Sequence, residues 1–184
     1  MSFDTFLFTT VHTLAGTSGF LDVLFVFLAK YLAVILFVVA CIFIFRQKKL
    51  KNRLYVLSFI SLTALMSRGF FTEVIRFFYD RPRPSVVLAF TPFFNETTSS
   101  FPSGHAAFLF ALACAVWYFN RKWGTWLFAG ACINGIARVV AGMHWPTDIL
   151  GGIFVSIISV FIVHMLISSY APLATKKPEL EKEG

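Results

Sequence analysis

Long apolar stretches dominate this chain and restrict its fold more than any other feature. Five of them lie at about 20–45, 54–79, 104–119, 125–143 and 149–170. A helix needs about 20 apolar residues to cross a hydrocarbon core of about 30 Å. The chain is 58% hydrophobic and only 14% charged, with a mean hydropathy of +0.76, which excludes an ordinary soluble domain. We expect an all-α fold, a polytopic membrane helical bundle with five transmembrane spans.

The two ends of the chain are more polar than its centre. Near the N-terminus, Phe3, Phe6, Leu7 and Leu14 recur at helical spacing. This pattern predicts a helix that lies in the membrane interface, and a disordered tail is the alternative. Residues 171–184 mix both signs of charge, which predicts a disordered cytoplasmic tail. We therefore expect one membrane domain over residues 1–170.

The net charge of +7 does not indicate a nucleic-acid partner, because of where the basic residues lie. The clusters RQKKLKNR at 46–53 and RKW at 121–123 fall between the apolar stretches. Loops rich in Lys and Arg stay on the cytoplasmic side of a membrane. This places the C-terminus in the cytoplasm, and the N-terminus with segments 79–103 and 143–148 outside. The partners expected from the sequence are the lipid bilayer and a membrane lipid.

Three polar segments are thereby brought to the outer face. They read RFFYDRPRP at 76–84, PSGH at 102–105 and RVVAGMHWPTD at 138–148. Arginines are usually less frequent on the outer face than in cytoplasmic loops, so their presence here indicates a function. Because guanidinium groups match phosphate oxygens and keep their charge, Arg76, Arg83 and Arg138 are predicted to bind one phosphate group.

The segment PSGH has three interpretations: a plain turn, a metal site or a phosphate cradle. Pro102 ends any preceding helix, and Ser103 is a good N-cap for the next one. The amides of Gly104 and His105 then face outward at the positive end of a helix dipole, which favours an anion. Three arginines on the same face favour the phosphate cradle.

His144 and Asp148 form a second reactive pair. The carboxylate accepts a proton from one ring nitrogen and leaves the other as a nucleophile toward phosphorus. His105 is then free to act as a general acid. Two histidines and one carboxylate are also metal-ligand types, but zinc usually has a tighter ligand set. We expect no metal and no cofactor.

These segments resemble the three-part signature of the type 2 phosphatidic acid phosphatase superfamily. The first motif of that family is Lys-x6-Arg-Pro, and Arg76 stands here in place of the Lys, with Arg83 at the Arg position. The second, Pro-Ser-Gly-His, is intact at 102–105. The third, Ser-Arg-x5-His-x3-Asp, has Ala137 in place of the Ser. The core of the resemblance covers residues 76–148.

The resemblance implies metal-independent phosphoryl transfer through a phosphohistidine. His144 attacks, Asp148 orients it, and His105 protonates the leaving group. The implied phosphate ligands are Arg76, Arg83, Arg138, Ser103 and Gly104. The short chain and the Leu21-Asp22 entry to the first span look most like bacterial undecaprenyl-diphosphate phosphatases.

Other functions stay open at this stage. A phosphatidic acid or phosphatidylglycerophosphate phosphatase belongs to the same class, as does a lipid A phosphatase. A catalytically silent lipid-binding or transport protein belongs to another class. The set of His105, His144 and Asp148 favours an enzyme, because binding alone does not require it. Arg68 and Glu73, inside the second apolar stretch, are either an ion pair that ties the spans or a support for the phosphate site. Lys30 in the first stretch, the oligomeric state and the identity of the lipid are left open.

Overall fold

The structure is a computed structural model, and it describes residues 3–94 and 96–170. Helices make up its regular structure, and no strand occurs in these two ranges. The elements are α1 (Phe3–His12), α2 (Gly19–Phe45), α3 (Leu50–Ala64), the π-helical η1 (Leu65–Phe71), α4 (Thr72–Phe78), α5 (Pro84–Val87), α6 (Gly104–Phe119), α7 (Arg121–Val140), α8 (Pro146–Ile167) and the 3₁₀ turn η2 (Ser168–Tyr170). The prediction of an all-α fold is confirmed. The tail predicted at 171–184 lies outside the described residues.

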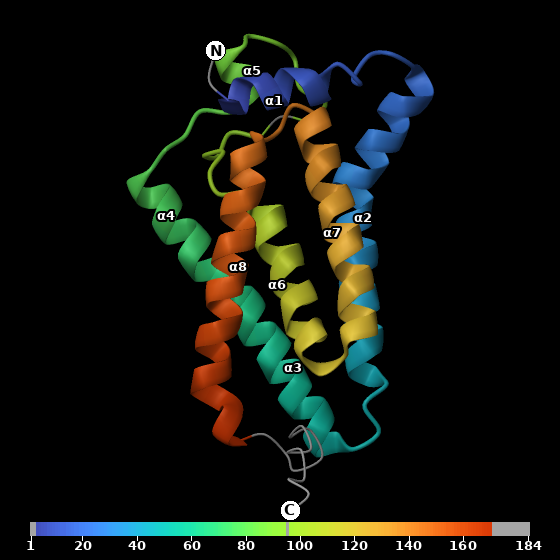
Figure 1. The fold of residues 1–184 in the computed structure, drawn as a ribbon, viewed down its shortest axis with the longest axis vertical. Coiled ribbons are helices and arrows are strands. Elements are labelled where there is room, and N and C mark those ends of the chain that lie inside the picture. The colour runs from blue at the N-terminus through green and yellow to red at the C-terminus, as the bar shows by residue number, and fades with distance from the viewer. Residues whose placement is uncertain (1–2, 95, 171–184) are drawn as a thin grey trace, which may run out of the picture.

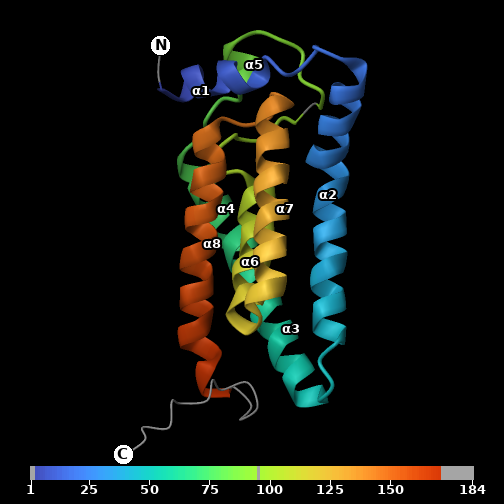
Figure 2. The ribbon, with the colours of Figure 1, turned by 45° about the vertical axis from the view of Figure 1, so that its right-hand side comes forward.

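Helix α6 lies at the centre of the bundle. It contacts α2, α3, η1, α7 and α8, and these helices run along the long axis of the molecule (Figures 1 and 2). Most of the buried apolar side chains of α6 belong to one large core cluster that also draws on α2, α3 and α7. The first turn of α6 is therefore held in a fixed position relative to every neighbouring helix.

The two ends of α6 are set by polar caps. Ser103 has extended backbone angles, and its hydroxyl accepts a hydrogen bond from the amide of Ala106 at 3.4 Å. At the other end, Asn120 ends α6 and also caps α7, because its Oδ1 accepts from the amide of Trp123 at 3.1 Å. One residue thus connects two antiparallel helices, and a Cβ on Gly124 would lie 2.3 Å from the Cα of Trp117. Only glycine allows this close approach.

A π-helical segment interrupts the second long helix. Helices α3 and α4 continue through η1, so that residues Leu50–Phe78 form one run of 29 residues. π-Helical turns inside α-helices are rare and are frequent at functional sites. Arg68 lies within η1, and Glu73 and Arg76 follow in α4. The interruption therefore lies beside the polar residues of this helix.

Three of the described helices are long and apolar enough to cross a membrane. They are Gly19–Phe45, Leu50–Phe78 and Pro146–Tyr170. Helix α6 is apolar but has 16 residues, and α7 has 20 residues but carries Asn134 and Arg138 among its apolar side chains. A membrane protein with helical spans is thus supported, and the count of five spans stays a prediction.

The polar segments gather at one end of the bundle. Helix α1 crosses this end and contacts α7 and α8, and α5 and the 79–103 segment lie beside it (Figures 1 and 2). The turn between α7 and α8 lies at the same end, whereas the α2–α3 and α6–α7 turns lie at the opposite end. The interfacial position expected for the N-terminal helix stays a prediction, but its helical form is present.

Candidate active site

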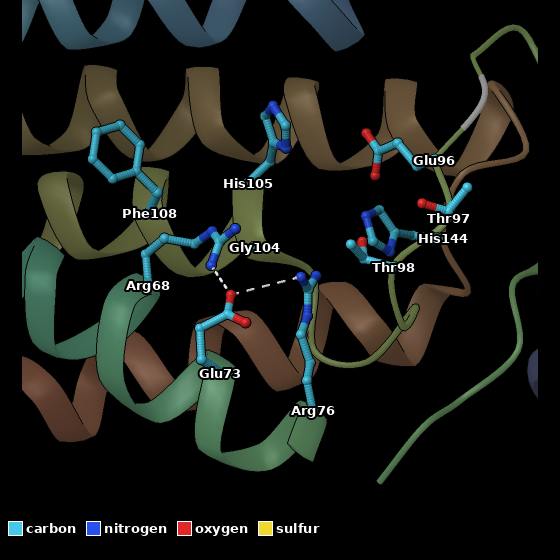
Figure 3. A pocket seen from close by; sticks show the side chains of 10 residues that line it. All are labelled: Arg68, Glu73, Arg76, Glu96, Thr97, Thr98, Gly104, His105, Phe108 and His144. Carbon is cyan, nitrogen blue, oxygen red and sulfur yellow. Dashed lines mark hydrogen bonds and ion pairs between the residues drawn. The ribbon is translucent and has the colours of Figure 1, made fainter.

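A cavity of about 680 Å³ opens at the end of the bundle where the polar segments meet. Its walls come from η1, α4, the 96–98 segment, the first turns of α6 and the turn before α8 (Figure 3). The lining residues are Arg68, Glu73, Arg76, Glu96, Thr97, Thr98, Gly104, His105, Phe108 and His144. Of the predicted site residues, Arg76, Gly104, His105 and His144 line this cavity directly.

His144 is held in one orientation by two acceptors. Its side chain is buried, and its Nδ1 lies 3.0 Å from the carbonyl oxygen of Ser100 and 3.4 Å from Oδ2 of Asp148. Because both neighbours of Nδ1 accept hydrogen bonds, Nδ1 carries the ring proton. The other nitrogen, Nε2, lies 3.5 Å from Nη2 of Arg138 and keeps its lone pair. This tautomer has the unprotonated nitrogen that nucleophilic attack requires.

The imidazole of His144 is neutral at pH 7. Burial, together with the positive charges of Arg138 and Arg83, outweighs the opposite effect of Asp148 and lowers its pKa to about 4. A histidine with a lowered pKa loses its proton as the pH rises through about 4. The ring of His144 is therefore neutral across the physiological pH range.

The Asp148 carboxylate is fixed from several directions at the start of α8. Its Oδ2 accepts hydrogen bonds from the Ser100 hydroxyl at 2.5 Å and from the Trp145 amide at 2.8 Å. Its Oδ1 accepts from Nη1 of Arg81 at 2.7 Å. The carboxylate is fully buried, and these donors compensate for its loss of water. The group that faces His144 is thus rigidly placed.

Arg83 and Arg138 form a buried cationic pair that is joined by one carboxylate. Glu96 Oε2 lies 2.8 Å from Nη2 of Arg83, and Glu96 Oε1 lies 2.8 Å from Nη2 of Arg138. Burial raises the pKa of Glu96, but the two guanidinium groups and their hydrogen bonds outweigh it and lower this pKa to about 2. An anionic group thus already bridges two of the three arginines predicted to bind phosphate, directly beside His144.

Arg76 approaches the site from the opposite wall. Its Nη2 donates to the carbonyl oxygen of Pro102 at 3.0 Å, which ties α4 to the segment before α6. Among residues 3–94 and 96–170, the buried Nε atoms of Arg76 and Arg138 have no hydrogen-bond partner. Buried donors are normally paired, so both guanidinium groups retain capacity for an anion.

The PSGH segment forms a helix start, as the sequence predicts. Ser103 is buried and caps α6 with its hydroxyl, and it is absent from the cavity lining. Gly104 and His105 do line the cavity at the positive end of the α6 dipole. The predicted contact of Ser103 with phosphate stays a prediction, as do the other assigned roles.

The alanine that replaces the serine of the third motif has an apolar environment. Ala137 is fully buried and belongs to a cluster with Ala29, Ala141 and Met143. A methyl group is well accommodated there, because its neighbours are apolar side chains.

Two further charged residues at this end were not singled out in the sequence. Arg81 donates to Asp148, and its Nη2 also lies 2.5 Å from Oδ2 of Asp4 in α1. Asp4 in turn accepts from the Thr147 hydroxyl at 2.7 Å. Arg81 stands within RPRP, two residues before the motif arginine Arg83, and this repeat is the only sequence signal for it. Nothing in the sequence connects Asp4 to a site that lies 144 residues further along the chain.

No group of three or more His, Cys, Asp or Glu side chains placed to hold a metal ion occurs in the described part of the chain. The features in place are a neutral oriented imidazole, a fixed carboxylate and several arginines at the end of a helical membrane bundle. Arginines and a nucleophilic histidine are suited to binding a phosphoryl group and to attacking its phosphorus. The fold and the site therefore define a membrane phosphatase.

Comparison with known proteins identifies the family. Residues 57–170 match the model of the PAP2 superfamily, and this chain belongs to that superfamily. The chain is 29% identical to "Undecaprenyl-diphosphatase BcrC" of Bacillus subtilis over 85% of its own length and 80% of the relative. It is 26% identical to "Putative undecaprenyl-diphosphatase YbjG" of Escherichia coli, covering 83% of this chain and 76% of that one.

A solved structure has the same architecture. The crystal structure of Aquifex aeolicus LpxE superimposes with a TM-score of 0.70 at 26% identity, covering 90% of this chain and 96% of that one. The resemblance inferred from the three motifs is thereby confirmed at the level of family and enzyme class.

Proposed function

We propose that this phosphatase hydrolyses a lipid (pyro)phosphate, with undecaprenyl diphosphate as the leading substrate. The observation that supports this most is the environment of His144: its Nδ1 faces two acceptors, and its Nε2 faces the arginine pair that already holds a carboxylate. A phosphoryl group that takes the place of the Glu96 carboxylate lies beside the nucleophilic nitrogen.

The reaction proceeds in two steps. In the first, Nε2 of His144 attacks the terminal phosphorus, the bond from phosphorus to the bridging oxygen breaks, and His105 gives a proton to that oxygen. In the second, water attacks the phosphohistidine, His105 accepts a proton from it, and inorganic phosphate leaves. Asp148 stabilises the positive imidazole, and the arginines stabilise charge on the phosphoryl oxygens.

Further observations support the proposed substrate and the proposed side of the membrane on which it is cleaved. One relative is named an undecaprenyl-diphosphatase and another a putative undecaprenyl-diphosphatase, and both match over most of this chain. The site lies at the end of the bundle opposite the basic turns at 46–53 and 121–123. By the distribution of positive charge, that end is extracytoplasmic in a bundle of five spans. A lipid whose headgroup binds at this end of the bundle keeps its tail in the bilayer.

Phosphate release by the purified protein tests this proposal. The protein in detergent is given undecaprenyl diphosphate, phosphatidylglycerophosphate, phosphatidic acid and a lipid A 1-phosphate, with and without EDTA. We expect the diphosphate to be cleaved at least several-fold more efficiently than the other lipids, and EDTA to leave the rate unchanged. A preference for phosphatidylglycerophosphate or phosphatidic acid would reject the substrate. A rate that vanishes in EDTA and returns with Mg²⁺ would reject the mechanism.

A further inference from the structure

Arg68 is a charged residue inside an apolar helix, beyond the arginines already described. It lies in the π-helical segment η1, and its side chain is 41% exposed and lines the active-site cavity. Its ion-pair partner within the described residues is Glu73, whose Oε1 also lies 3.9 Å from Nη1 of Arg76. Ionisable groups in membrane helices are costly and usually functional. We therefore expect Arg68 to have a function in the cavity.

The guanidinium of Arg68 lies directly over the start of α6. A Cβ added to Gly104 would come within 2.6 Å of Arg68 Nε, so the glycine makes room for this side chain. His105 follows in the same turn, and the close-up view places Arg68 on the far side of it from His144 (Figure 3). Arg76 lies between Arg68 and His144 in the same view, so arginine side chains extend along the cavity from the surroundings of His144 to Arg68.

An apolar groove begins where the polar cavity ends. This second cavity, of about 460 Å³, is lined by apolar side chains of α2, α3 and α6, together with η1. Arg68 and Phe108 line both cavities. The polar cavity thus leads from His144, past Arg76 and His105, to Arg68, and the apolar groove between the helices begins at Arg68 (Figure 3).

A lipid diphosphate has its groups in the same order: a terminal phosphate, a second phosphate and an apolar chain. We propose that Arg68 binds the second phosphate, the one that stays on the lipid, and that the first part of the substrate's own tail occupies the adjoining groove. This inference rests on the function proposed above, and it assigns the specificity for diphosphates to a residue outside the three motifs.

The position gives Arg68 a defined effect on the reaction. When the bond between the terminal phosphorus and the bridging oxygen breaks, the electron pair passes to that oxygen. Negative charge builds up on the departing phosphate in the transition state, until the proton from His105 has been transferred to this oxygen. A guanidinium on this phosphate stabilises the transition state more than the bound substrate, which raises the rate. A lipid monophosphate has no phosphate at this position, so its cleavage does not depend on Arg68.

Farnesyl phosphate and farnesyl diphosphate test this, because their tails are identical. We expect Arg68→Gln to lower kcat/KM for the diphosphate by about tenfold or more, the scale of one lost charge-assisted contact, and to change the monophosphate value by less than about threefold. Arg68→Lys restores part of the loss because it keeps the charge. Lys30→Gln is the matched control: Lys30 is an exposed cation of α2 that lines neither cavity, and the change leaves both values unaltered.

Binding of a non-hydrolysable probe gives a second measurement that does not need turnover. Methylenediphosphonate should raise the thermal unfolding temperature of the wild type more than orthophosphate does, and Arg68→Gln should remove that difference. Equal losses for the two farnesyl substrates, or an undiminished effect of methylenediphosphonate, would overturn the role of Arg68 and leave the phosphatase intact. A wild-type protein that cleaves neither substrate would overturn both proposals.

Discussion

The carboxylate of Glu96 lies 2.8 Å from the guanidinium of Arg138, inside the region where a substrate phosphate is proposed to bind. The same carboxylate contacts Arg83 at an equal distance. The loop that carries Glu96 thus supplies an internal anion that neutralises buried positive charge. At the proposed phosphate site, the substrate and Glu96 use the same two arginines, so we expect them to compete for these side chains.

Replacing Glu96 with Gln removes this competitor. We expect inorganic phosphate and vanadate to inhibit the variant with Ki values about three- to tenfold lower than those for the wild type. In the variant no carboxylate has to leave the two arginines before the inhibitor binds, so the apparent affinity equals the intrinsic affinity of the site. The pKa of Glu96, about 2, keeps the carboxylate charged at all working pH values, so the effect should not vary between pH 5 and pH 8.

The matched control for that experiment is Asp80→Asn, which removes one negative charge from an exposed position in the segment between α4 and α6. It should leave the Ki values unchanged. An unchanged or higher Ki in the Glu96 variant would show that this carboxylate does not compete with the phosphate.

The protonation of His144 provides a prediction for pH. Because its pKa is lowered to about 4, the ring is neutral above about pH 5 and becomes charged only as the pH falls through about 4. Nitrogen NMR of ¹⁵N-histidine-labelled protein, with resonances assigned through His144→Asn, should show the Nδ1-protonated tautomer at pH 7. Protonation with a midpoint near 6.5, the ordinary histidine value, would contradict the environment described for this ring.

Arg81 and Asp4 are predicted to act through Asp148. Arg81→Met removes a donor from the carboxylate that orients His144, and a small misplacement of the nucleophile lowers kcat by about 10²-fold. KM should change little, and Arg81→Lys should recover part of the rate. Asp4→Asn should lower kcat less, since it acts one contact further away.

Asp22→Asn is the control for the Asp4 variant, because Asp22 accepts a hydrogen bond from the Gly16 amide outside the active site. A higher KM with an unchanged kcat, or no recovery of the rate in Arg81→Lys, would count against a positioning role and favour a purely structural role for Arg81.

The orientation in the membrane is open to chemical labelling. In a protein in which Cys41, Cys114 and Cys132 are replaced, a cysteine at position 88 should react with an impermeant maleimide in intact cells. A cysteine at position 49 should react only after the cells are opened. The reverse pattern would place the active site in the cytoplasm.

Much of the fold was predictable because hydropathy and caps are local properties. The apolar stretches mark the helices to within a few residues, and Ser103 starts α6 as an N-cap residue should. The motif spacing was also sufficient to predict that Arg83, Arg138 and His144 meet, since a helical bundle brings the ends of its helices together. These inferences need no knowledge of how side chains pair.

The remaining features depend on pairings that no local pattern encodes. Glu96 lies in a segment without periodicity, and its place between two arginines follows from how that segment folds over the site. The contact between Asp4 and Arg81 joins residues that are 77 positions apart. The π-helical turns that aim Arg68 at the cavity depend on packing against α6, and the sequence of η1 carries no distinct sign of them.

The central claim is that the phosphoryl group is transferred to His144. The direct test is to mix the protein with substrate labelled in its terminal phosphate, to quench within milliseconds in alkali, which preserves phosphohistidine, and to map the label by mass spectrometry. We predict that the label is found on the peptide containing His144, that it disappears in acid, and that His144→Asn abolishes it together with turnover. Rapid turnover by His144→Asn, or label on another residue of the wild type, would contradict the mechanism.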